Sequence, residues 1–215
     1  MKILFEDTHL QVISKPAGTI TEGPTKNGKE SAESLLSKNG QHPVYACHRL
    51  DRDTTGVVIF AKTKSALRFI NEQFSKRQIK KTYMACVDGK WAKAWNRIET
   101  RIRRNTGAAW ENADEGKLAI TTYRRLAFWN NRSLLQVLPK TGRTHQIRLH
   151  CVLKSCPISG DRLYGQRTED LPSMALHARE LLFKHPTSKE HLRIEAPLPE
   201  FWHSHWLKDC PLQID

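Results

Sequence analysis

The sequence predicts an α+β fold, with a mixed and mainly antiparallel sheet flanked by helices and loops. Short apolar segments recur along the chain, most of them are joined by turns, and only a few segments show helical periodicity. A doubly wound parallel sheet would need a helix between successive strands. No linker or internal repeat interrupts the 215 residues. We therefore expect a single domain over residues 1–215, either undivided or with two lobes that share a continuous sheet.

The first third of the chain is expected to contain three strands and two helices. Lys15-Pro16-Ala17-Gly18 ends the first strand pair, Ser31 is a good N-cap, and Asn39-Gly40 is a good helix stop. Thr63 then opens an amphipathic segment. In chain order the expected elements are strands at 3–6 and 10–14, a helix at 31–38, a strand at 57–61 and a helix from 63.

The rest of the chain is expected to be richer in strands. Asn130-Asn131 is a hairpin turn signal, residues 185–188 form a second turn, and Pro199 is a good first residue for a short helix. The expected elements are strands at 82–87, 118–128, 133–138, 177–184 and 191–195, with helices beginning near 144 and at 199. The basic, Trp-rich segment 90–115 has no clear assignment.

The balance of charge indicates a polyanionic partner. The chain has 35 Lys and Arg against 22 Asp and Glu, which gives a formal net charge of +13. A basic surface kept only for solubility is the alternative. No apolar segment is long enough to span a membrane and no signal peptide is visible, so we expect a cytoplasmic protein. The five scattered cysteines predict neither a disulfide framework nor a zinc site.

The segment from His48 to Gly56 concentrates reactive side chains directly before a buried strand. It reads His48-Arg49-Leu50-Asp51-Arg52-Asp53-Thr54-Thr55-Gly56. Loops held by a rigid scaffold often carry function. An aspartate in such a loop is also a common turn-former that bonds its own backbone. From the loop alone, Asp51 is either a catalytic carboxylate or a turn residue.

Two further segments carry candidate residues. Thr141 to His150 packs two arginines and two histidines into a turn that enters a helix, and Arg148 there could hold an aspartate ionised and oriented. These charges could equally form a solvated helix face. Tyr83 follows Lys80-Lys81-Thr82, where its ring could stack on an unpaired base for about 1–3 kcal/mol or could simply fill the core.

Together these segments resemble the motifs of the pseudouridine synthases of the RluA family. Lys15 to Gly18 resembles the first motif, His48 to Gly56 the active-site loop, Lys81-Thr82-Tyr83 the K-x-Y element, and Thr141 to His150 the TGRTHQIR-LH motif. The downstream signatures match Gly160-Asp161-Arg162-Leu163-Tyr164-Gly165, Leu176-His177-Ala178 and Phe183-Lys184-His185-Pro186. The resemblance covers the chain from Ile3 to Pro197.

Three departures from the family pattern are visible. Thr55 replaces the usual serine and keeps the hydroxyl, while Ser155-Cys156 stands where a Gly-His pair is commoner. We also see no N-terminal RNA-binding extension of the S4 type. The chain is therefore similar to the short, single-domain branch of the family, in which the catalytic domain itself must contact RNA.

The resemblance implies an RNA pseudouridine synthase, an isomerase that acts on uridines in rRNA, tRNA or both. It makes Asp51 the catalytic aspartate, Arg148 its ion-pair partner, Tyr83 the ring that stacks on the target base, and Arg49 the residue that enters the RNA as the uridine leaves. His48, Leu50, Arg143 and His145, which lie in the same motifs, are expected to contact the substrate. No metal, cofactor, membrane or protein partner is expected, and a monomer is the simplest state.

The reaction cuts uracil from C1′ of its ribose, turns it and rejoins it through C5. Asp51 could attack C1′ or remove a proton from C2′, and the sequence does not choose between these routes. The uracil must leave its stack at a cost of about a few kcal/mol. Basic side chains at 76–81, 97–104 and 124–125 could supply that energy through phosphate contacts. We assign Trp91, Trp95 and Trp110 to packing or to covering a sheet.

Two other classes of function compete with this interpretation. A non-catalytic RNA-binding protein with the same fold would be expected to have lost Asp51, Tyr83 or Arg148, and all three are present. A metal-dependent nuclease is favoured only by the ten histidines and by Asp51-x-Asp53, where two neighbouring arginines would compete with a cation. An assay in EDTA separates the nuclease from the isomerase.

Overall fold

The computed structural model describes all residues except 24–29, 41, 105–109, 113–115, 166–172 and 215. Most neighbouring strands within each part of the chain pair in an antiparallel manner, and few helices accompany them. The prediction of an α+β fold is confirmed. The chain forms two compact units: residues 1–81 with 178–197, and residues 82–177 with 198–215. Whether they form one domain stays a prediction, and each unit is described by itself below.

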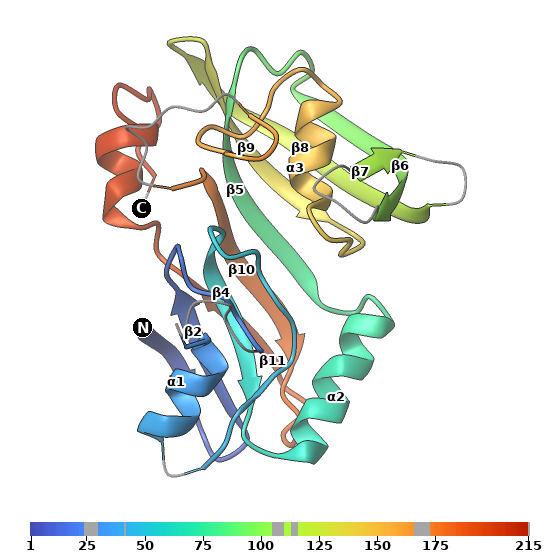
Figure 1. Ribbon diagram of the computed structural model, residues 1–215, viewed down its shortest axis with the longest axis vertical. Helices are drawn as coiled ribbons and strands as arrows, with labels where there is room; N and C mark the ends of the chain where they lie inside the picture. Colours follow the sequence, from blue (N-terminus) through green and yellow to red (C-terminus); the bar gives the residue numbers. More distant parts are fainter. Residues whose placement is uncertain (24–29, 41, 105–109, 113–115, 166–172, 215) are drawn as a thin grey trace. The chain divides into compact units, whose positions relative to one another are not determined.

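The first unit contains a sheet with the strand order β1-β2-β4-β10 (Figure 1). Its short strand β3 pairs with β4, and β11 pairs with β10. The apolar strand β4 is buried along its whole length, which explains why its sequence shows no polar alternation. The strands are β1 (Lys2–Glu6), β2 (Leu10–Lys15), β3 (Tyr45–Ala46), β4 (Thr55–Ala61), β10 (Leu176–Lys184) and β11 (His191–Glu195).

Two capped helices belong to the first unit, α1 (Ala32–Asn39) and α2 (Lys64–Ser75). The Oγ of Ser31 accepts the N–H of Ser34, and the Oγ1 of Thr63 accepts the N–H of Ala66. Both caps satisfy amide groups that the first helical turn leaves unbonded. The apolar face of α2 packs on the buried side chains of β2 and β4 and forms the core of this unit. Both helices begin where the sequence predicted.

The second unit contains a sheet with the strand order β5-β9-β8-β6-β7. Asn130 and Asn131 both have positive φ, which closes the predicted hairpin between β8 and β9 with the twist that antiparallel strands prefer. The strands are β5 (Lys80–Asp88), β6 (Trp95–Arg104), β7 (Trp110–Asn112), β8 (Lys117–Trp129) and β9 (Arg132–Pro139). The unassigned segment 90–115 therefore supplies strands β6 and β7.

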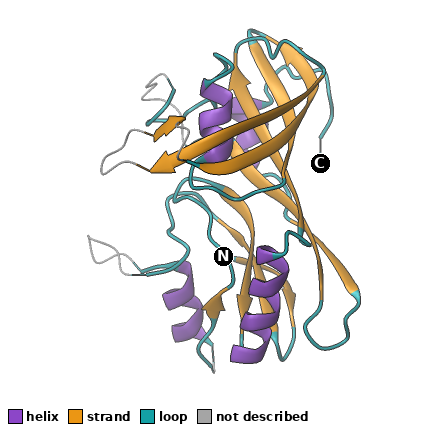
Figure 2. Ribbon diagram, turned by 90° about the vertical axis from the view of Figure 1, so that its right-hand side faces the viewer, coloured by secondary structure: helices purple, strands orange, loops and turns teal. Residues whose placement is uncertain are grey.

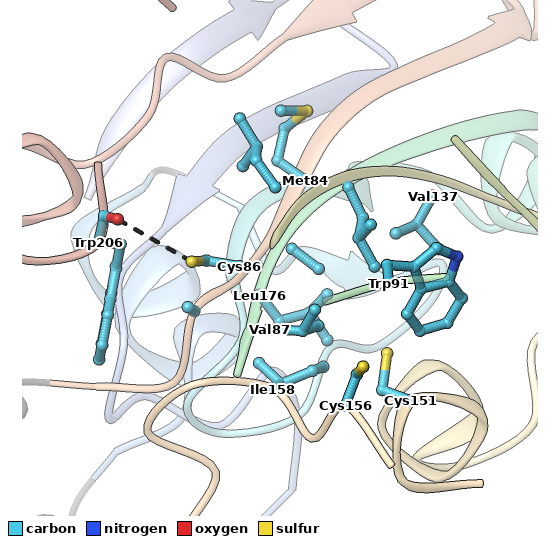
Figure 3. Packing of buried hydrophobic residues seen from close by; sticks show 14 of the residues in the cluster. Met84, Cys86, Val87, Trp91, Val137, Cys151, Cys156, Ile158, Leu176 and Trp206 are labelled. Atoms are coloured by element: carbon cyan, nitrogen blue, oxygen red, sulfur yellow. Dashed lines mark hydrogen bonds between the residues drawn. The ribbon is translucent and has the colours of Figure 1, made fainter. Parts of the chain in front are cut away.

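Helix α3 (Gln146–Val152) and the short π-helical turn η1 (Trp202–Trp206) complete the second unit (Figure 2). The Nε2 of His150 lies 3.0 Å from the Oγ1 of Thr100 on β6, which places α3 against one face of the sheet. Figure 3 shows part of the core, to which β5, β9, α3 and η1 contribute side chains and in which the Sγ of Cys86 lies 3.9 Å from the carbonyl oxygen of Trp206. The predicted helix after Pro199 is confirmed, and its two tryptophans are fully buried.

The packing role predicted for the tryptophans of segment 90–115 is only partly correct. Trp91 is 1% exposed and packs in the core, as predicted, whereas Trp95 is 56% exposed. For Trp95 the packing alternative was wrong, because the outward positions of β6 face solvent, and the alternative of covering the sheet is left. The side chain of Trp110 lies outside the described residues.

Candidate active site

The loop from His48 to Gly56 is anchored on both sides of Asp51. The Oγ1 of Thr21 accepts the N–H of Leu50 at 3.1 Å and lies 3.2 Å from its carbonyl oxygen, to which it donates. On the other side of Asp51, the Nζ of Lys15 donates to the carbonyl of Arg52 at 2.9 Å. The two neighbours of Asp51 are therefore held by side chains from other parts of the first unit, as preorganisation of a reactive group requires.

Lys15 is a buried ammonium group beneath this loop. Its side chain is 1% exposed, and its Nζ also donates to the carbonyls of Pro16 and Thr19 at 3.0 and 2.7 Å. Burial lowers the pKa of Lys15 to about 8, while the charges of Asp53 and Asp51 act in the opposite direction. At neutral pH the group therefore remains a cation.

His48 supports the loop from the start of the motif. Its Nε2 accepts the N–H of Ile59 at 3.1 Å, and its ring lies 4.8 Å from the ring of Phe74 on α2. Burial and the charge of Lys81 lower the pKa of His48 to about 3, so the ring is neutral and can accept this hydrogen bond. The observed contacts of His48 are with the scaffold, and its expected contact with the substrate stays a prediction.

Gly56 ends the loop at a place where no other residue fits. Its φ is +113°, and a Cβ added there would clash with the main chain of Ala178 on β10. A glycine is needed both for the backbone conformation and for the close approach of the two strands. The loop is therefore tied to β10 directly after the residues that carry its charges.

The remaining loop residues divide into buried and exposed positions. Leu50 is 6% exposed, so its side chain belongs to the protein interior. The side chain of Arg49 is 74% exposed and lies 3.7 Å from Glu22. The turn after Asp51 is closed by its main-chain carbonyl, which accepts the N–H of Thr54 at 3.1 Å. This bond involves the main chain of Asp51, so the two interpretations of its carboxylate, catalyst or turn-former, both stay open.

In the second unit, Arg148 is the centre of a buried charged group. Its Nε and Nη2 donate to the two oxygens of Asp161, each at 2.7 Å, and the Asp161 side chain is 1% exposed. The Cζ of Arg148 lies 4.9 Å from the centre of the Tyr164 ring. A two-point ion pair and a cation–π contact together fix the plane of the guanidinium. The alternative of a solvated helix face is therefore wrong for Arg148.

The turn before α3 is held by the side chain of Gln146. Its Oε1 accepts the hydroxyl of Thr141 at 2.7 Å and the N–H of Arg143 at 2.9 Å. The Nε of Arg143 donates to the carbonyl of Leu118 at 3.0 Å. His145 has a left-handed conformation, with φ of 55°, and its Nδ1 lies 3.0 Å from the hydroxyl of Tyr164. The expected substrate contacts of Arg143 and His145 stay predictions.

Tyr83 lies on β5 opposite Val137 of β9. Its ring is partly buried and packs against the core of the second unit. The ring rests on the core without being enclosed by it. This position is compatible both with a core tyrosine and with a ring that stacks on a base. Its role in stacking on a base stays a prediction.

The predicted site residues fall into the two units. Asp51 lies with His48, Arg49 and Leu50 in the first unit, and the others, namely Tyr83, Arg143, His145 and Arg148, lie in the second. Sequence reasoning gave no role to Lys15, Thr21, Asp161 or Tyr164. Lys15, Asp161 and Tyr164 left a signal, because each lies in a segment that matches a family signature, whereas Thr21 left none.

The structure also bears on membrane and metal binding. No helix among the described residues is long and apolar enough to cross a membrane. Within the same part of the chain, no three His, Cys, Asp or Glu side chains gather where they could hold a metal ion. The expectation that the reaction needs no metal stays a prediction, which the EDTA assay would test.

Comparison with known proteins supports the resemblance seen in the sequence. Residues 9–152 match the RNA pseudouridylate synthase family. The ribosomal large subunit pseudouridine synthase C of Yersinia pestis is 37% identical over 208 residues, which cover 91% of this chain and 65% of that protein. The protein of the same name from Escherichia coli K12 is 35% identical over 212 residues, covering 92% of this chain and 66% of that protein. The chain thus spans just under two thirds of these relatives.

Two solved human structures share the fold. Human RNA pseudouridylate synthase domain containing 4 aligns with a TM-score of 0.77 and 27% identity, over 96% of this chain and 91% of that one. Human RNA pseudouridylate synthase domain containing 1 aligns with a TM-score of 0.78 and 25% identity, over 92% and 83%. The matched segment 9–152 includes the anchored loop, Tyr83 and Arg148. The chain belongs to the RNA pseudouridylate synthase family.

Proposed function

We propose that the protein isomerises uridine to pseudouridine in RNA, with Asp51 as the reactive carboxylate. The observation that carries this proposal is the anchoring of Leu50 and Arg52, the two neighbours of Asp51, by Thr21 and Lys15. The buried ammonium of Lys15 fixes the loop that carries Asp51 by bonding three main-chain carbonyls, and this costs the burial of a charge. The buried Lys15 therefore favours the enzyme over a non-catalytic RNA-binding protein.

The proposed roles of the other residues follow from their surroundings. Arg148 is fixed in the second unit by Asp161 and Tyr164, and we assign it to hold the Asp51 carboxylate ionised. Tyr83 stacks on the extruded uracil. Arg49, whose side chain is largely exposed, enters the RNA in place of the uridine. An ionised Asp51 can act as a nucleophile at C1′ or as a base at C2′.

Large-subunit ribosomal RNA is our proposed substrate, because the two bacterial relatives are named for it. The net charge of +13 suits a polyanion of this kind. We further expect a monomeric, cytoplasmic protein that needs no metal, cofactor or protein partner. These expectations rest on the sequence alone.

The test compares two aspartates of the same loop. Purified wild-type protein, Asp51→Asn and Asp53→Asn are incubated with large-subunit rRNA in EDTA, and pseudouridine is mapped along the RNA. We expect product at defined positions with the wild type and Asp53→Asn, and none with Asp51→Asn, whose RNA affinity should stay close to that of the wild type. Product from Asp51→Asn without deamidation to aspartate would contradict the assigned role. A wild-type protein that binds RNA and yields no pseudouridine would favour the non-catalytic alternative.

A further inference from the structure

One tryptophan of the second unit is exposed where a buried side chain would be usual. Four of the five tryptophans with described side chains are at most 8% exposed, namely Trp91, Trp129, Trp202 and Trp206. Trp95 is 56% exposed, more than any other large apolar side chain in the described part of the chain. An indole left in solvent forgoes the stabilisation that burial of its large apolar area would give, so its surroundings decide whether it can serve in binding.

The neighbours of Trp95 are arginines. Arg124 lies directly opposite Trp95 on β8, and its Cζ is 5.5 Å from the centre of the indole ring. Arg97 and Arg101, two and six residues after Trp95 on β6, are exposed on the same face. We call Trp95, Arg97, Arg101 and Arg124 the Trp95 face.

The Trp95 face carries an excess of positive charge. Glu99, between Arg97 and Arg101 on the same face, lies 2.8 Å from the Nη2 of Arg97. Both side chains of this pair are about half exposed or more, at 60% and 49%. Such a pair contributes little to stability, so a phosphate can replace Glu99 as the partner of Arg97 at low cost.

The Trp95 face is separate from the helix that carries Arg148. The intervening residues of β6 point to the opposite side of the sheet, where Thr100 contacts His150 of α3. Trp95 and α3 therefore lie on opposite faces of the same sheet. An RNA segment that stacks on Trp95 is consequently a different segment from the one that meets Arg148.

We propose that the Trp95 face is a second RNA contact, which stacks one unpaired base on the indole and binds the adjoining phosphates through Arg124 and Arg97. The inference rests on the proposed RNA substrate, and it adds a contact with single-stranded RNA that flanks the modified uridine. The cation–π contact with Arg124 orients the indole before RNA arrives. Stacking of this kind accepts any base, so the face supplies affinity and leaves the choice of uridine to other residues.

The test measures binding of a fluorescently labelled oligouridylate of about 12 nucleotides, within the range of site sizes for single-strand binding domains. Binding of the full chain is recorded by anisotropy over a range of salt concentrations. The variants are Trp95→Ala, Trp95→Phe and Arg124→Gln. Arg68→Gln, which removes one exposed charge from α2 in the first unit, is the matched control. Thermal unfolding confirms that each variant is folded.

We expect Trp95→Ala to weaken binding about tenfold with little change in salt dependence, because it removes a stacked base. Trp95→Phe should recover part of this loss, since a phenyl ring also stacks. Arg124→Gln should lower the slope of log K against log salt by about 0.7, the value for one phosphate on a single strand. Arg68→Gln should leave the slope unchanged.

RNA affinities of Trp95→Ala and Arg124→Gln equal to that of the wild type would overturn the proposal. If Trp95→Ala also changed the oligomeric state, the Trp95 face would be assigned to a protein partner instead. Because the assay measures no product, it is separate from the test of Asp51. Loss of binding in the Trp95 variants stands even if no pseudouridine is formed. Normal binding by those variants removes the second contact even if the enzyme is active.

Discussion

Asp161 holds the guanidinium of Arg148 through two hydrogen bonds of 2.7 Å, in a place where the carboxylate is 1% exposed. The Oδ1 of Asp161 also accepts the main-chain N–H groups of Leu163 and Tyr164. The carboxylate is therefore fixed by the backbone as well as by the arginine. It follows that Arg148 has both a structural and a proposed catalytic task, and that the two can be separated by experiment.

Arg148→Ala should lower the free energy of unfolding by about 3–5 kcal/mol, because it leaves the buried Asp161 carboxylate without its partner. Urea denaturation measures this loss. Arg193→Ala removes an arginine that pairs with Glu180 and Glu195 at the surface, and its unfolding midpoint should stay close to that of the wild type. Equal midpoints for the two variants would show that the buried pair is not what stabilises this region.

A double variant should give a stable, folded protein that lacks Arg148. In Arg148→Met combined with Asp161→Asn, the buried charges are removed together while the Asn carbonyl can still accept the N–H groups of Leu163 and Tyr164, and stability should recover relative to Arg148→Ala. We expect this double variant to be folded and to form no pseudouridine. Activity near that of the wild type would remove Arg148 from the proposed site.

Asp161→Asn should reduce kcat by about 100-fold, because the amide keeps one acceptor for Arg148 and loses the second, which frees the guanidinium to turn. The KM for RNA should change little, since Asp161 is buried and has no access to the substrate. Single-turnover and steady-state rates of pseudouridine formation separate the two constants. A raised KM with an unchanged kcat would indicate that Asp161 shapes the RNA-binding surface rather than Arg148.

The stability of the protein should fall on acidification partly through His48. Its pKa is lowered from 6.5 to about 3 in the folded protein, so below pH 6.5 the unfolded chain takes up a proton that the folded chain does not. The contribution of neutral His48 is fully present above pH 6.5 and is lost progressively towards pH 3. Protonation would also remove the acceptor for the N–H of Ile59.

His48→Gln, which can accept the same hydrogen bond and does not titrate, checks this expectation. Denaturation curves recorded between pH 7 and pH 4 should show a weaker pH dependence for the variant than for the wild type. His42→Gln, which changes an exposed histidine, is the control. Parallel pH dependence for the wild type and His48→Gln would mean that other groups govern acid unfolding.

Gly56→Ala should destabilise the protein by about 3 kcal/mol or more, because the new Cβ meets the main chain of Ala178 and the backbone has positive φ. Gly23 also has positive φ, but a Cβ there would meet nothing within 4 Å. Gly23→Ala should therefore show only the backbone strain, about 1 kcal/mol. Similar unfolding free energies for the two variants would contradict the proposed steric role of Gly56.

Local signals explain how much of the fold could be predicted. Ser31 and Thr63 cap the two helices at the predicted positions, and Asn130-Asn131 forms the predicted turn, because each acts within a few residues. Strand β6 escaped prediction because its inward positions are not uniformly apolar: Asn96 and Thr100 alternate with Ile98 and Ile102. A period of two is difficult to recognise when both faces carry polar side chains.

The contacts of the candidate site could not be predicted either, because they join residues that are far apart in the sequence. The motifs identified Asp51 and Arg148 as candidates, but the contact between Arg148 and Asp161 joins residues 13 positions apart, and that between Lys15 and Arg52 spans 37. No helical or strand periodicity encodes such pairs. The exposure of Trp95 was missed for a related reason. A tryptophan in a strand is more often buried, and whether it is exposed depends on its neighbours across the sheet.

The order of residues in the two units has a consequence for synthesis on the ribosome. Strand β4 lies beside β10, and Gly56 meets Ala178, so the nascent first unit lacks the support for the loop from His48 to Gly56 until β10 has emerged. The second unit likewise waits for Trp202 and Trp206 to close its core. Both units are therefore completed late and almost together, and a prematurely terminated chain would leave each of them without part of its core.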